Sequence, residues 1–437
     1  MPRGLLTARA RKWCFAAICL ALPFAPSLSA QSDYQKDVDF ALESIARECG
    51  DLIAQKQIDW KAISKEFSAA SKTVNSHAEH LVLLTRLLAR LRDGHAEVLP
   101  SEATKSVRWP DAPELVGAGM FLCRSGKKIL LKTVYGSAKE LGLEAGSEVV
   151  KVDGQPVDAW LKRRVAELSE TQSFSTDQHA FFRATHQGLA LPKGTRLDLE
   201  LKEPGGKTKK RTITYTRGNA TPWGPAVAIE GLESTDDLNF KWLDDSVAYV
   251  HVRRCKETLP AQMDVALAKL HTAKAMILDF RANSGGGFDH AEFMGRFVPA
   301  GERLSFGNTY ESRGEHPFAG PIVVIVDGTV VSAGETGSGS FKEDGRAYMI
   351  GESATAGMSS QKTTLALPSG LFSLYVSTRS NKQSFNGGRG LEGIGVLPHE
   401  IVPYEAKDLA AGVDTLIRRA TELAGRFPAD KVPYRAP

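Results

Sequence analysis

The 437-residue sequence has only five cysteines, and it lacks the motifs typical of disulfide frameworks, zinc sites and phosphate-binding loops. Of its five cysteines, only Cys49, Cys123 and Cys255 lie beyond residue 30, and they are widely spaced with no Cys-x-x-Cys pattern. They allow at most one disulfide bridge and exclude a disulfide scaffold. P-loop and dinucleotide-binding patterns are missing as well, which argues against a phosphate site. We therefore expect neither a metal nor an organic cofactor.

The chain has almost no net positive charge once the first residues are set aside. The formal charge of +4 equals the contribution of Arg3, Arg9, Arg11 and Lys12, so the rest of the chain is close to neutral. No basic stripe remains that would predict nucleic-acid binding. The apolar run WCFAAICLALPFA and the small residues PSLSA follow, which together predict a signal peptide over residues 1–30.

This segment is too short and too unevenly flanked to predict a stable membrane span. Cys19 stands in AAIC, a poor match to a lipoprotein site. We expect cleavage near Ala30 and an exported product, either periplasmic or secreted.

Composition and periodicity divide the remaining chain into three regions. Residues 31–109 are predicted to be helical, with a stripe of leucines and with Gly94 as the left-handed residue that ends the last helix. The stripe comprises Leu81, Leu84, Leu87, Leu88 and Leu91. Residues 110–218 contain short β-rich runs and, around residues 135–160, an order of elements typical of a PDZ-like domain, whose strand edge binds extended peptides. A generic β-rich spacer is the alternative interpretation.

Residues 219–437 alternate between apolar strands and helices. The runs SVAYVHV, AMILDF and PIVVIVD are separated by helical stretches such as PAQMDVALAKLHTA. This alternation predicts an α/β core with a largely parallel sheet, whose active site lies at the carboxyl ends of the strands.

Two predicted strand ends lead into segments whose residues are candidates for a catalytic site. AMILDF runs into RANSGGGFDH, and PIVVIVD runs into GTVVSAGE. Ser332 and Glu335 form a capping box, which is most often only structural. Three glycines beside a serine that heads a helix are also suited to an oxyanion hole, although a tight turn explains the glycines equally well.

A nucleophilic serine needs a base, and several histidines are candidates. His290 lies close to the glycine loop, and His95 follows a predicted helix end. His77 and His80 could share a helix face as metal ligands, but the sequence offers no third ligand.

Four motifs in order resemble the carboxy-terminal processing (tail-specific) serine peptidase family: DFRANSGG, VVSAGE, GRAYMIGE and LEGIGVLPHE. QIDWKAI and LARLRDGHAEV are similar to the branch that contains the tricorn protease core and interphotoreceptor retinoid-binding protein. The resemblance covers roughly residues 35–405. It implies a ClpP/crotonase-like α/β core, an N-terminal helical region and an inserted PDZ-like domain.

The resemblance also implies roles for individual residues. One branch uses a lysine 25 residues after the serine, but position 357 is glycine and Lys362 is five residues out of register, so a Ser–Lys dyad is not expected. The other branch implies Ser332 as nucleophile, His95 as general base and Glu392 as supporting acid. Gly285 and Ala333 would supply the oxyanion hole, and substrate would contact the glycines at 286, 287, 117 and 119.

Two positions depart from the branch. Gly94 stands where the tricorn core has serine, and Pro398-His399 replaces the usual Pro-Asp. The chain order His, Ser, Glu and the missing first glycine of a nucleophile elbow exclude an α/β-hydrolase.

We expect an exported serine endopeptidase acting on unfolded or tail-bearing polypeptides, with the PDZ-like domain holding a substrate C-terminus. The alternative is a non-catalytic binder of peptides or apolar ligands. The sequence fixes neither the cleavage specificity nor the oligomeric state.

Overall fold

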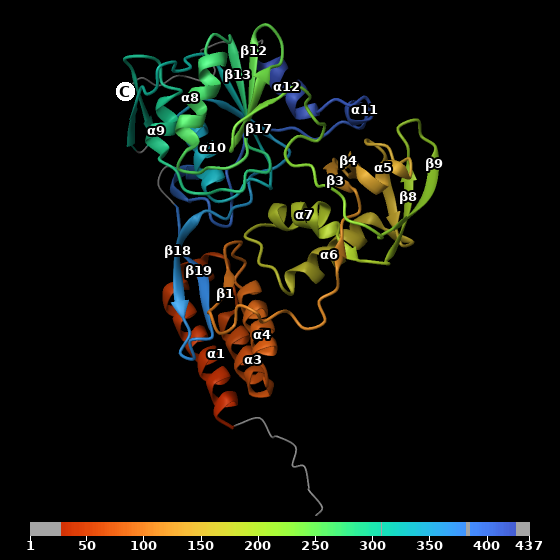
Figure 1. Cartoon of the computed structure of the whole chain (residues 1–437), viewed down its shortest axis with the longest axis vertical. Coiled ribbons are helices and arrows are strands. Elements are labelled where there is room, and N and C mark those ends of the chain that lie inside the picture. The colour runs from red at the N-terminus through yellow and green to blue at the C-terminus, as the bar shows by residue number, and fades with distance from the viewer. Residues whose placement is uncertain (1–27, 307, 382–384, 425–437) are drawn as a thin grey trace, which may run out of the picture.

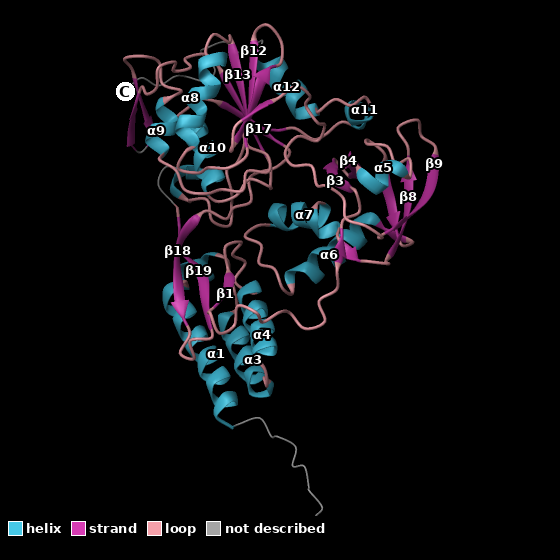
Figure 2. Ribbon diagram, in the orientation of Figure 1, coloured by secondary structure: helices cyan, strands magenta, loops and turns pink. Residues whose placement is uncertain are grey.

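The computed structural model describes residues 28–306, 308–381 and 385–424, arranged as three groups of elements (Figure 1). Residues 1–27 of the predicted signal peptide lie outside the described residues. The three groups are a helical group with a small sheet, a middle group around a β-sheet, and an α/β group (Figure 2).

The N-terminal group combines helices with a small antiparallel sheet of order β1-β19-β18. Its helices are α1 (Leu28–Glu48), α2 (Gly50–Gln55), α3 (Trp60–Ala70) and α4 (His77–Ala89), and its strands are β1 (Glu97–Pro100), β18 (Ser360–Ala366) and β19 (Phe372–Ser380). The predicted leucine stripe on α4 packs with Leu374 and Val376 of β19 in one hydrophobic cluster. The sequence therefore predicted the helical face correctly, but gave no signal for the strands that cover it.

The prediction that Gly94 ends this helical region in a left-handed conformation is wrong. Helix α4 ends at Ala89, and Arg92 adopts the positive φ of 49°, whereas Gly94 does not. The helix ends earlier than its leucine pattern suggests, so the left-handed position falls before Gly94. A glycine is needed at 94 for another reason, because a Cβ there would lie 2.8 Å from Met358 Sδ.

The middle group forms a sheet of order β3-β4-β5-β8-β9, with β6 paired to β5. The strands of this sheet are β3 (Met120–Ser125), β4 (Lys128–Val134), β5 (Glu148–Val152), β6 (Gln155–Pro156), β8 (Arg196–Lys202) and β9 (Thr208–Thr214). Strand β2 (Leu115–Val116) pairs separately with β7 (Leu191–Pro192). The helices of the middle group are α5 (Gly136–Glu140), α6 (Val157–Ser169) and α7 (Asp177–Thr185). The β-rich runs were predicted, while α6 and α7 were not singled out.

Within the described residues, the α/β group has a seven-stranded sheet of order β10-β11-β12-β13-β16-β17-β20, parallel from β12 onward. These strands are β10 (Glu233–Ser234), β11 (Leu238–Trp242), β12 (Val247–Val252), β13 (Ala275–Asp279), β16 (Ile322–Val326), β17 (Tyr348–Gly351) and β20 (Glu400–Ile401). The helices are α8 (Leu259–Leu270), α9 (His290–Gly295), α10 (Ala333–Glu343), α11 (Ala406–Ala410) and α12 (Thr415–Ala424), and β14 (Arg303–Phe306) pairs with β15 (Asn308–Glu311). The predicted α/β fold with a largely parallel sheet is confirmed.

Alternating strand residues cover the two faces of this sheet. Met276 and Leu278 pack with residues of α8, α9 and α10, whereas Ile277 packs with α12 and with Leu130 of the middle group. Both faces are buried, which explains why β12, β13 and β16 are apolar apart from His251 and Asp279.

Helices α1–α12 include no segment long and apolar enough to cross a bilayer, as far as the described residues extend. Cys49, Cys123 and Cys255 are free thiols, all buried. The single bridge that the sequence left open is therefore not formed among them.

Candidate active site

Two neighbouring parallel strands deliver the serine and the glycine loop to the same edge of the sheet. Strand β13 ends at Asp279 before the glycine loop (residues 284–287), and β16 ends at Val326 before the turn that reaches Ser332. Parallel strands end on the same side, so the two segments meet there. A Cβ placed on Gly285 would lie 2.8 Å from Ser332 Cβ, which shows how closely they approach.

Ser332 occupies a strained backbone conformation immediately before α10. Its φ of 54° and ψ of −121° lie outside the regions that non-glycine residues favour, and such strain concentrates at functional sites. The Ser332 N–H donates to Glu335 Oε2 at 3.1 Å, so the carboxylate reaches back as the capping box predicts. The next amide, that of Ala333, donates no hydrogen bond to any described residue.

Glu335 is fully buried and holds the strained turn in place. Its carboxylate also accepts from Thr355 Oγ1 at 2.6 Å, from Gly357 N–H at 2.7 Å and from Met358 N–H at 2.9 Å. Burial raises the pKa of Glu335 to about 8, against these donors. This one side chain thus joins the serine turn to the loop at residues 355–358.

The predicted oxyanion donors differ in their availability. The Ala333 amide is uncommitted, but the Gly285 N–H donates to Asn283 Oδ1 at 2.9 Å. The Gly285 carbonyl accepts from Cys255 N–H at 2.8 Å, which anchors the loop. In this conformation only part of the predicted oxyanion hole is free to bind a substrate.

The other predicted substrate-contacting glycines lie in different settings. Gly286 backs onto Cys255, since a Cβ there would lie 2.3 Å from the Cys255 carbonyl oxygen, whereas Gly287 faces open space. Gly117 and Gly119 lie in the turn between β2 and β3, where Asn219 Nδ2 and the Tyr135 N–H donate to their carbonyls. Neither glycine of this turn lines the cavities described below.

His95 lies in a separate network made from hydroxyls and Asp93. Its Nδ1 is 3.5 Å from Ser360 Oγ, which is 2.6 Å from Ser377 Oγ. Ser377 Oγ donates to Asp93 Oδ1 at 2.8 Å, and the His95 N–H donates to the same oxygen at 3.0 Å. His95 Nε2 is buried with no partner among the described residues, so the ring offers one unpaired nitrogen.

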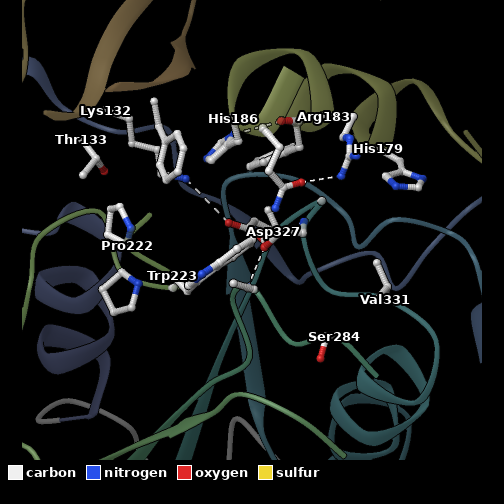
Figure 3. Close-up of a pocket in the computed structure, with 18 residues that line it drawn as sticks. Lys132, Thr133, His179, Arg183, His186, Pro222, Trp223, Ser284, Asp327 and Val331 are labelled. Atoms are coloured by element: carbon white, nitrogen blue, oxygen red, sulfur yellow. Dashed lines mark hydrogen bonds and ion pairs between the residues drawn. The ribbon is translucent and has the colours of Figure 1, made fainter. Parts of the chain in front are cut away.

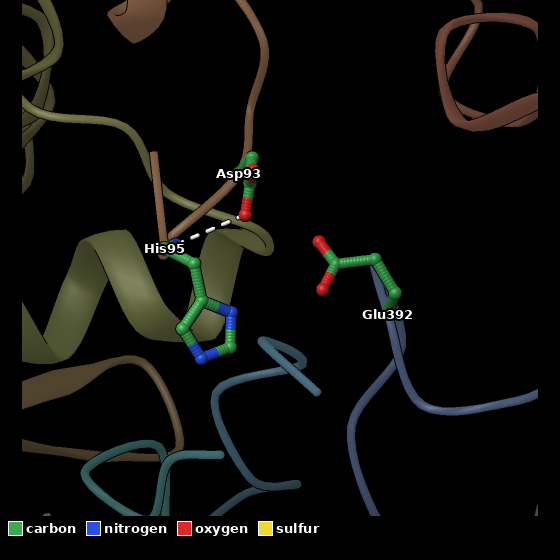
Figure 4. Close-up of side chains that lie close together, drawn as sticks. All are labelled: Asp93, His95 and Glu392. Carbon is green, nitrogen blue, oxygen red and sulfur yellow. Dashed lines mark hydrogen bonds between the residues drawn. The ribbon is translucent and has the colours of Figure 1, made fainter. Parts of the chain in front are cut away.

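Glu392 lies beside His95 at this end of the site. Its side chain is fully buried and accepts from Lys56 Nζ at 2.7 Å and from Ser175 Oγ at 2.8 Å. Ser175 Oγ in turn accepts from the Gly94 N–H at 2.9 Å. In Figure 4 one ring nitrogen of His95 faces the Glu392 carboxylate and the other points away from both acids.

The acids and cations around His95 set its protonation. Burial, then the charge of Lys362, lowers the pKa of His95 to about 4, so the ring is neutral at pH 7. Burial raises the pKa of Glu392 to about 7, partly opposed by Lys56. A neutral imidazole with a free nitrogen is what a general base requires.

Asp93, His95 and Glu392 offer atoms within 4.8 Å of one another, a spacing that could suit a metal ion. The carboxylates are already engaged, because Asp93 accepts from Ser377 and His95, and the Lys56 ammonium pairs with Glu392. These cations and donors make the cluster a poor metal site. His77 and His80 are committed elsewhere, to Tyr34 and Asp37.

The structure brings His95 and Glu392 together but does not join them to Ser332. Among the described residues, no hydrogen bond links the Ser332 hydroxyl to His95. They are connected through Glu335, which binds the Met358 amide, and through the Met358 side chain, which packs on Gly94. The rival His290 uses its Nε2 to contact Thr336 Oγ1 at 2.7 Å, on the first turn of α10.

Two cavities open beside these groups. One, of about 310 Å³, is lined by Ser284 and Val331, the neighbours of Gly285 and Ser332. The other, of about 480 Å³, is lined by Gly94, His95 and Met358. His179 and Arg183 of α7 line both cavities, and Figure 3 shows them projecting from α7 toward the core loops.

The sequence patterns do not identify the acidic, hydroxyl and cationic residues that surround His95. Asp93 stood in a quoted motif without a role, while Lys56, Ser175, Ser360 and Ser377 come from segments with no recognisable pattern. Only the folded chain brings these five together.

Comparisons with known proteins agree with this architecture. The model of peptidase family S41 matches residues 246–402. The chain is 23% identical over 361 residues to the carboxyl-terminal-processing protease of Picosynechococcus sp., covering 79% of this chain and 78% of that protein. It is 23% identical over 307 residues to the protein of the same name from Synechocystis sp., covering 67% and 64%.

Solved structures share the fold. Mature CPAF superposes with a TM-score of 0.65 at 15% identity, covering 91% of this chain and 97% of that one. A peptidase-like structure from Parabacteroides merdae gives a TM-score of 0.51 at 16% identity, covering 92% and 99%.

Proposed function

We propose that the chain is an exported serine endopeptidase of the S41 kind that acts on unfolded or tail-bearing polypeptides. The match of the peptidase family S41 model to residues 246–402 and the similarity to carboxyl-terminal-processing proteases support this proposal. Ser332 is the nucleophile, His95 the general base and Glu392 the supporting acid. The sheet of β10–β20 is the ClpP/crotonase-like core that the resemblance implies, and residues 110–218 are the PDZ-like domain.

In this mechanism Ser332 Oγ attacks the peptide carbonyl while His95 Nε2 takes its proton. The Ala333 amide stabilises the oxyanion, joined by the Gly285 amide once it leaves Asn283. Collapse of the intermediate breaks the C–N bond, and His95 gives the proton to the leaving amine. Water then hydrolyses the acyl-enzyme by the same proton transfers and releases Ser332.

The observation that carries the proposal is the Ser332 turn. A serine held at φ 54° by a buried glutamate, heading a helix beside an uncommitted amide, is far better explained by nucleophilic chemistry than by capping alone.

Catalysis requires the two ends of the site to approach. A general base must come within about 2.6–3.2 Å of the hydroxyl whose proton it takes, and catalytic hydrogen bonds often form only when substrate binds. Movement of Met358, which packs on Gly94, is the rearrangement we propose.

The residue order and the missing lysine favour the tricorn-like branch. Gly94 lacks the hydroxyl of that branch, and we propose that Ser175 replaces it, because Ser175 Oγ bridges the Gly94 amide and Glu392.

The test is covalent labelling with a fluorophosphonate, followed by mapping of the labelled residue. We expect the label on Ser332, and its loss in Ser332→Ala and His95→Ala without loss of fold by circular dichroism. Ser284→Ala and His290→Ala are the controls and should retain the label. Ser284 lines the cavity beside Ser332.

A wild-type protein that never reacts would contradict the peptidase mechanism. Retention of a peptide or apolar ligand by that unreactive protein would revive the non-catalytic alternative, which the comparisons do not favour.

Export is tested separately by cell fractionation and by sequencing the N-terminus of the purified protein. We expect a mature chain beginning near residue 31; a chain that retains Met1 in the cytoplasm would contradict it.

A further inference from the structure

We propose that Arg183 of α7 binds a carboxylate of the polypeptide substrate, in the cavity beside Ser332. The inference rests on the proposed function and specifies the chemistry of the substrate. It comes from an arginine that lines two cavities, is oriented by two hydrogen bonds, and has no carboxylate partner among the residues that the structure describes.

The guanidinium is held in place by neutral groups alone. Arg183 Nε donates to Gln172 Oε1 at 2.9 Å and Nη1 donates to Gln187 Oε1 at 2.6 Å. No carboxylate lies within 4.0 Å of it among the residues that the structure describes. The two amide oxygens fix the orientation of the side chain and leave its charge uncompensated.

Two other cations near the site, Lys132 and Lys56, are paired with acids. Lys132, in the same cavity, contacts Glu352 at 2.8 Å and Asp327 at 3.7 Å, and Lys56 contacts Glu392 at 2.7 Å. Burial lowers the pKa of Arg183, and no acid offsets that effect. Leaving a half-buried charge unpaired costs free energy, which an anionic ligand would recover.

The position of Arg183 relates this charge to the scissile bond. It lines the cavity that holds Ser284 and Val331 (Figure 3). It also lines the cavity that holds His95. A chain bound across Ser332 and approached by His95 would therefore pass it. A guanidinium with a free Nη2 edge is suited to a planar carboxylate.

Two sources of carboxylate fit this chemistry: the C-terminal carboxylate of the substrate and an Asp or Glu side chain. Four N-terminally labelled, unstructured 20-residue peptides separate them. They combine a free acid or a carboxamide at the C-terminus with a single internal Glu or Gln, and are otherwise identical and without other acids.

Binding is measured by fluorescence anisotropy to the full-length Ser332→Ala protein, which does not cleave them. We expect at least a tenfold preference for one carboxylate source, and Arg183→Gln should remove that preference while binding of the doubly neutral peptide stays unchanged. Arg183→Lys should retain part of it. Arg196→Gln, which makes the same charge change at an exposed position on β8, is the matched control and should keep the full preference.

A preference for the free C-terminus assigns the site to the chain end, and a preference for Glu assigns it to a side chain. Equal binding of all four peptides, no binding of any, or a preference that survives in Arg183→Gln would overturn the proposal. Fluorophosphonate labelling of Ser332 in the otherwise unaltered protein reports the peptidase function independently, so the two failures are distinguishable.

Discussion

The two ends of the candidate site are built in different ways. The Ser332 end consists of two strand-end loops of one sheet, fixed by glycines, by Glu335 and by main-chain hydrogen bonds. The His95 end draws its groups from the helical region, the middle region and the β18–β19 hairpin, joined by side-chain hydroxyls and a buried Lys56–Glu392 pair.

The difference has a consequence for tolerance to change. At the Ser332 end the backbone of Gly285 lies against the nucleophile, so a methyl group added at that glycine has to move Ser332. The His95 end is held by hydrogen bonds between side-chain hydroxyls, those of Ser360 and Ser377. Loss of one hydroxyl alters the position or the charge of His95 without displacing the backbone. The predictions below test this contrast.

The largest effect is expected from Gly285→Ala. Its φ of +74° disfavours alanine, and the new Cβ would lie 2.8 Å from Ser332 Cβ. Displacing a reacting group by about 1 Å costs about 100-fold in rate, so we expect kcat/KM to fall at least that far. Steady-state cleavage of an unstructured peptide measures it.

Gly287→Ala is the matched control, because a Cβ there meets nothing within 4 Å and the backbone is not left-handed. Equal activities for the two variants would show that the glycine loop does not constrain Ser332.

A smaller effect is expected from Ser377→Ala. The change removes the hydroxyl that links Asp93 Oδ1 to Ser360 Oγ. Ser360 Oγ in turn contacts His95 Nδ1, so the lost hydroxyl is two hydrogen bonds away from the imidazole. We expect about a tenfold lower kcat with KM unchanged, equivalent to about 1.4 kcal/mol of transition-state stabilisation. Thr378→Ala, at the next and exposed hydroxyl, should leave kcat unaltered. A fall in stability with no change in kcat would mean that the hydroxyl chain is only structural.

The smallest effect at neutral pH is expected from the titration of Glu392. With a pKa of about 7 this acid is half ionised at pH 7, and ionisation is needed to support a protonated His95. Activity should therefore rise about twofold from pH 7 to 8, fall about fivefold from pH 7 to 6 and about tenfold per unit below pH 6, and fall more steeply still below pH 4, where His95 itself becomes charged.

Glu392→Gln should have lower activity without the inflection near pH 7. If the inflection persists in that variant, another group titrates and Glu392 is not the supporting acid. The pH profile of kcat/KM for a substrate without groups titrating between pH 5 and 9 makes the measurement.

The sequence by itself determined the parallel α/β sheet, the helical leucine face and the meeting of Ser332 with the glycine loop. These follow from local regularities: apolar strands, helical periodicity, and the rule that parallel strands end on one side. His95 and Glu392 were named through motif resemblance, and the fold does bring them together.

Only the tertiary structure decided how that second end is held. Strand β19 of the β18–β19 hairpin pairs with β1 of the helical group and not with the α/β sheet. Ser175 Oγ accepts a hydrogen bond from the Gly94 N–H and donates one to Glu392. Hydroxyls and single charges have no periodicity and can bond with many partners, so their pairing is fixed by packing between distant segments. For the same reason no sequence pattern indicates that Arg183 has no carboxylate partner within the described part of the chain, because ion pairing depends on which distant segments pack together.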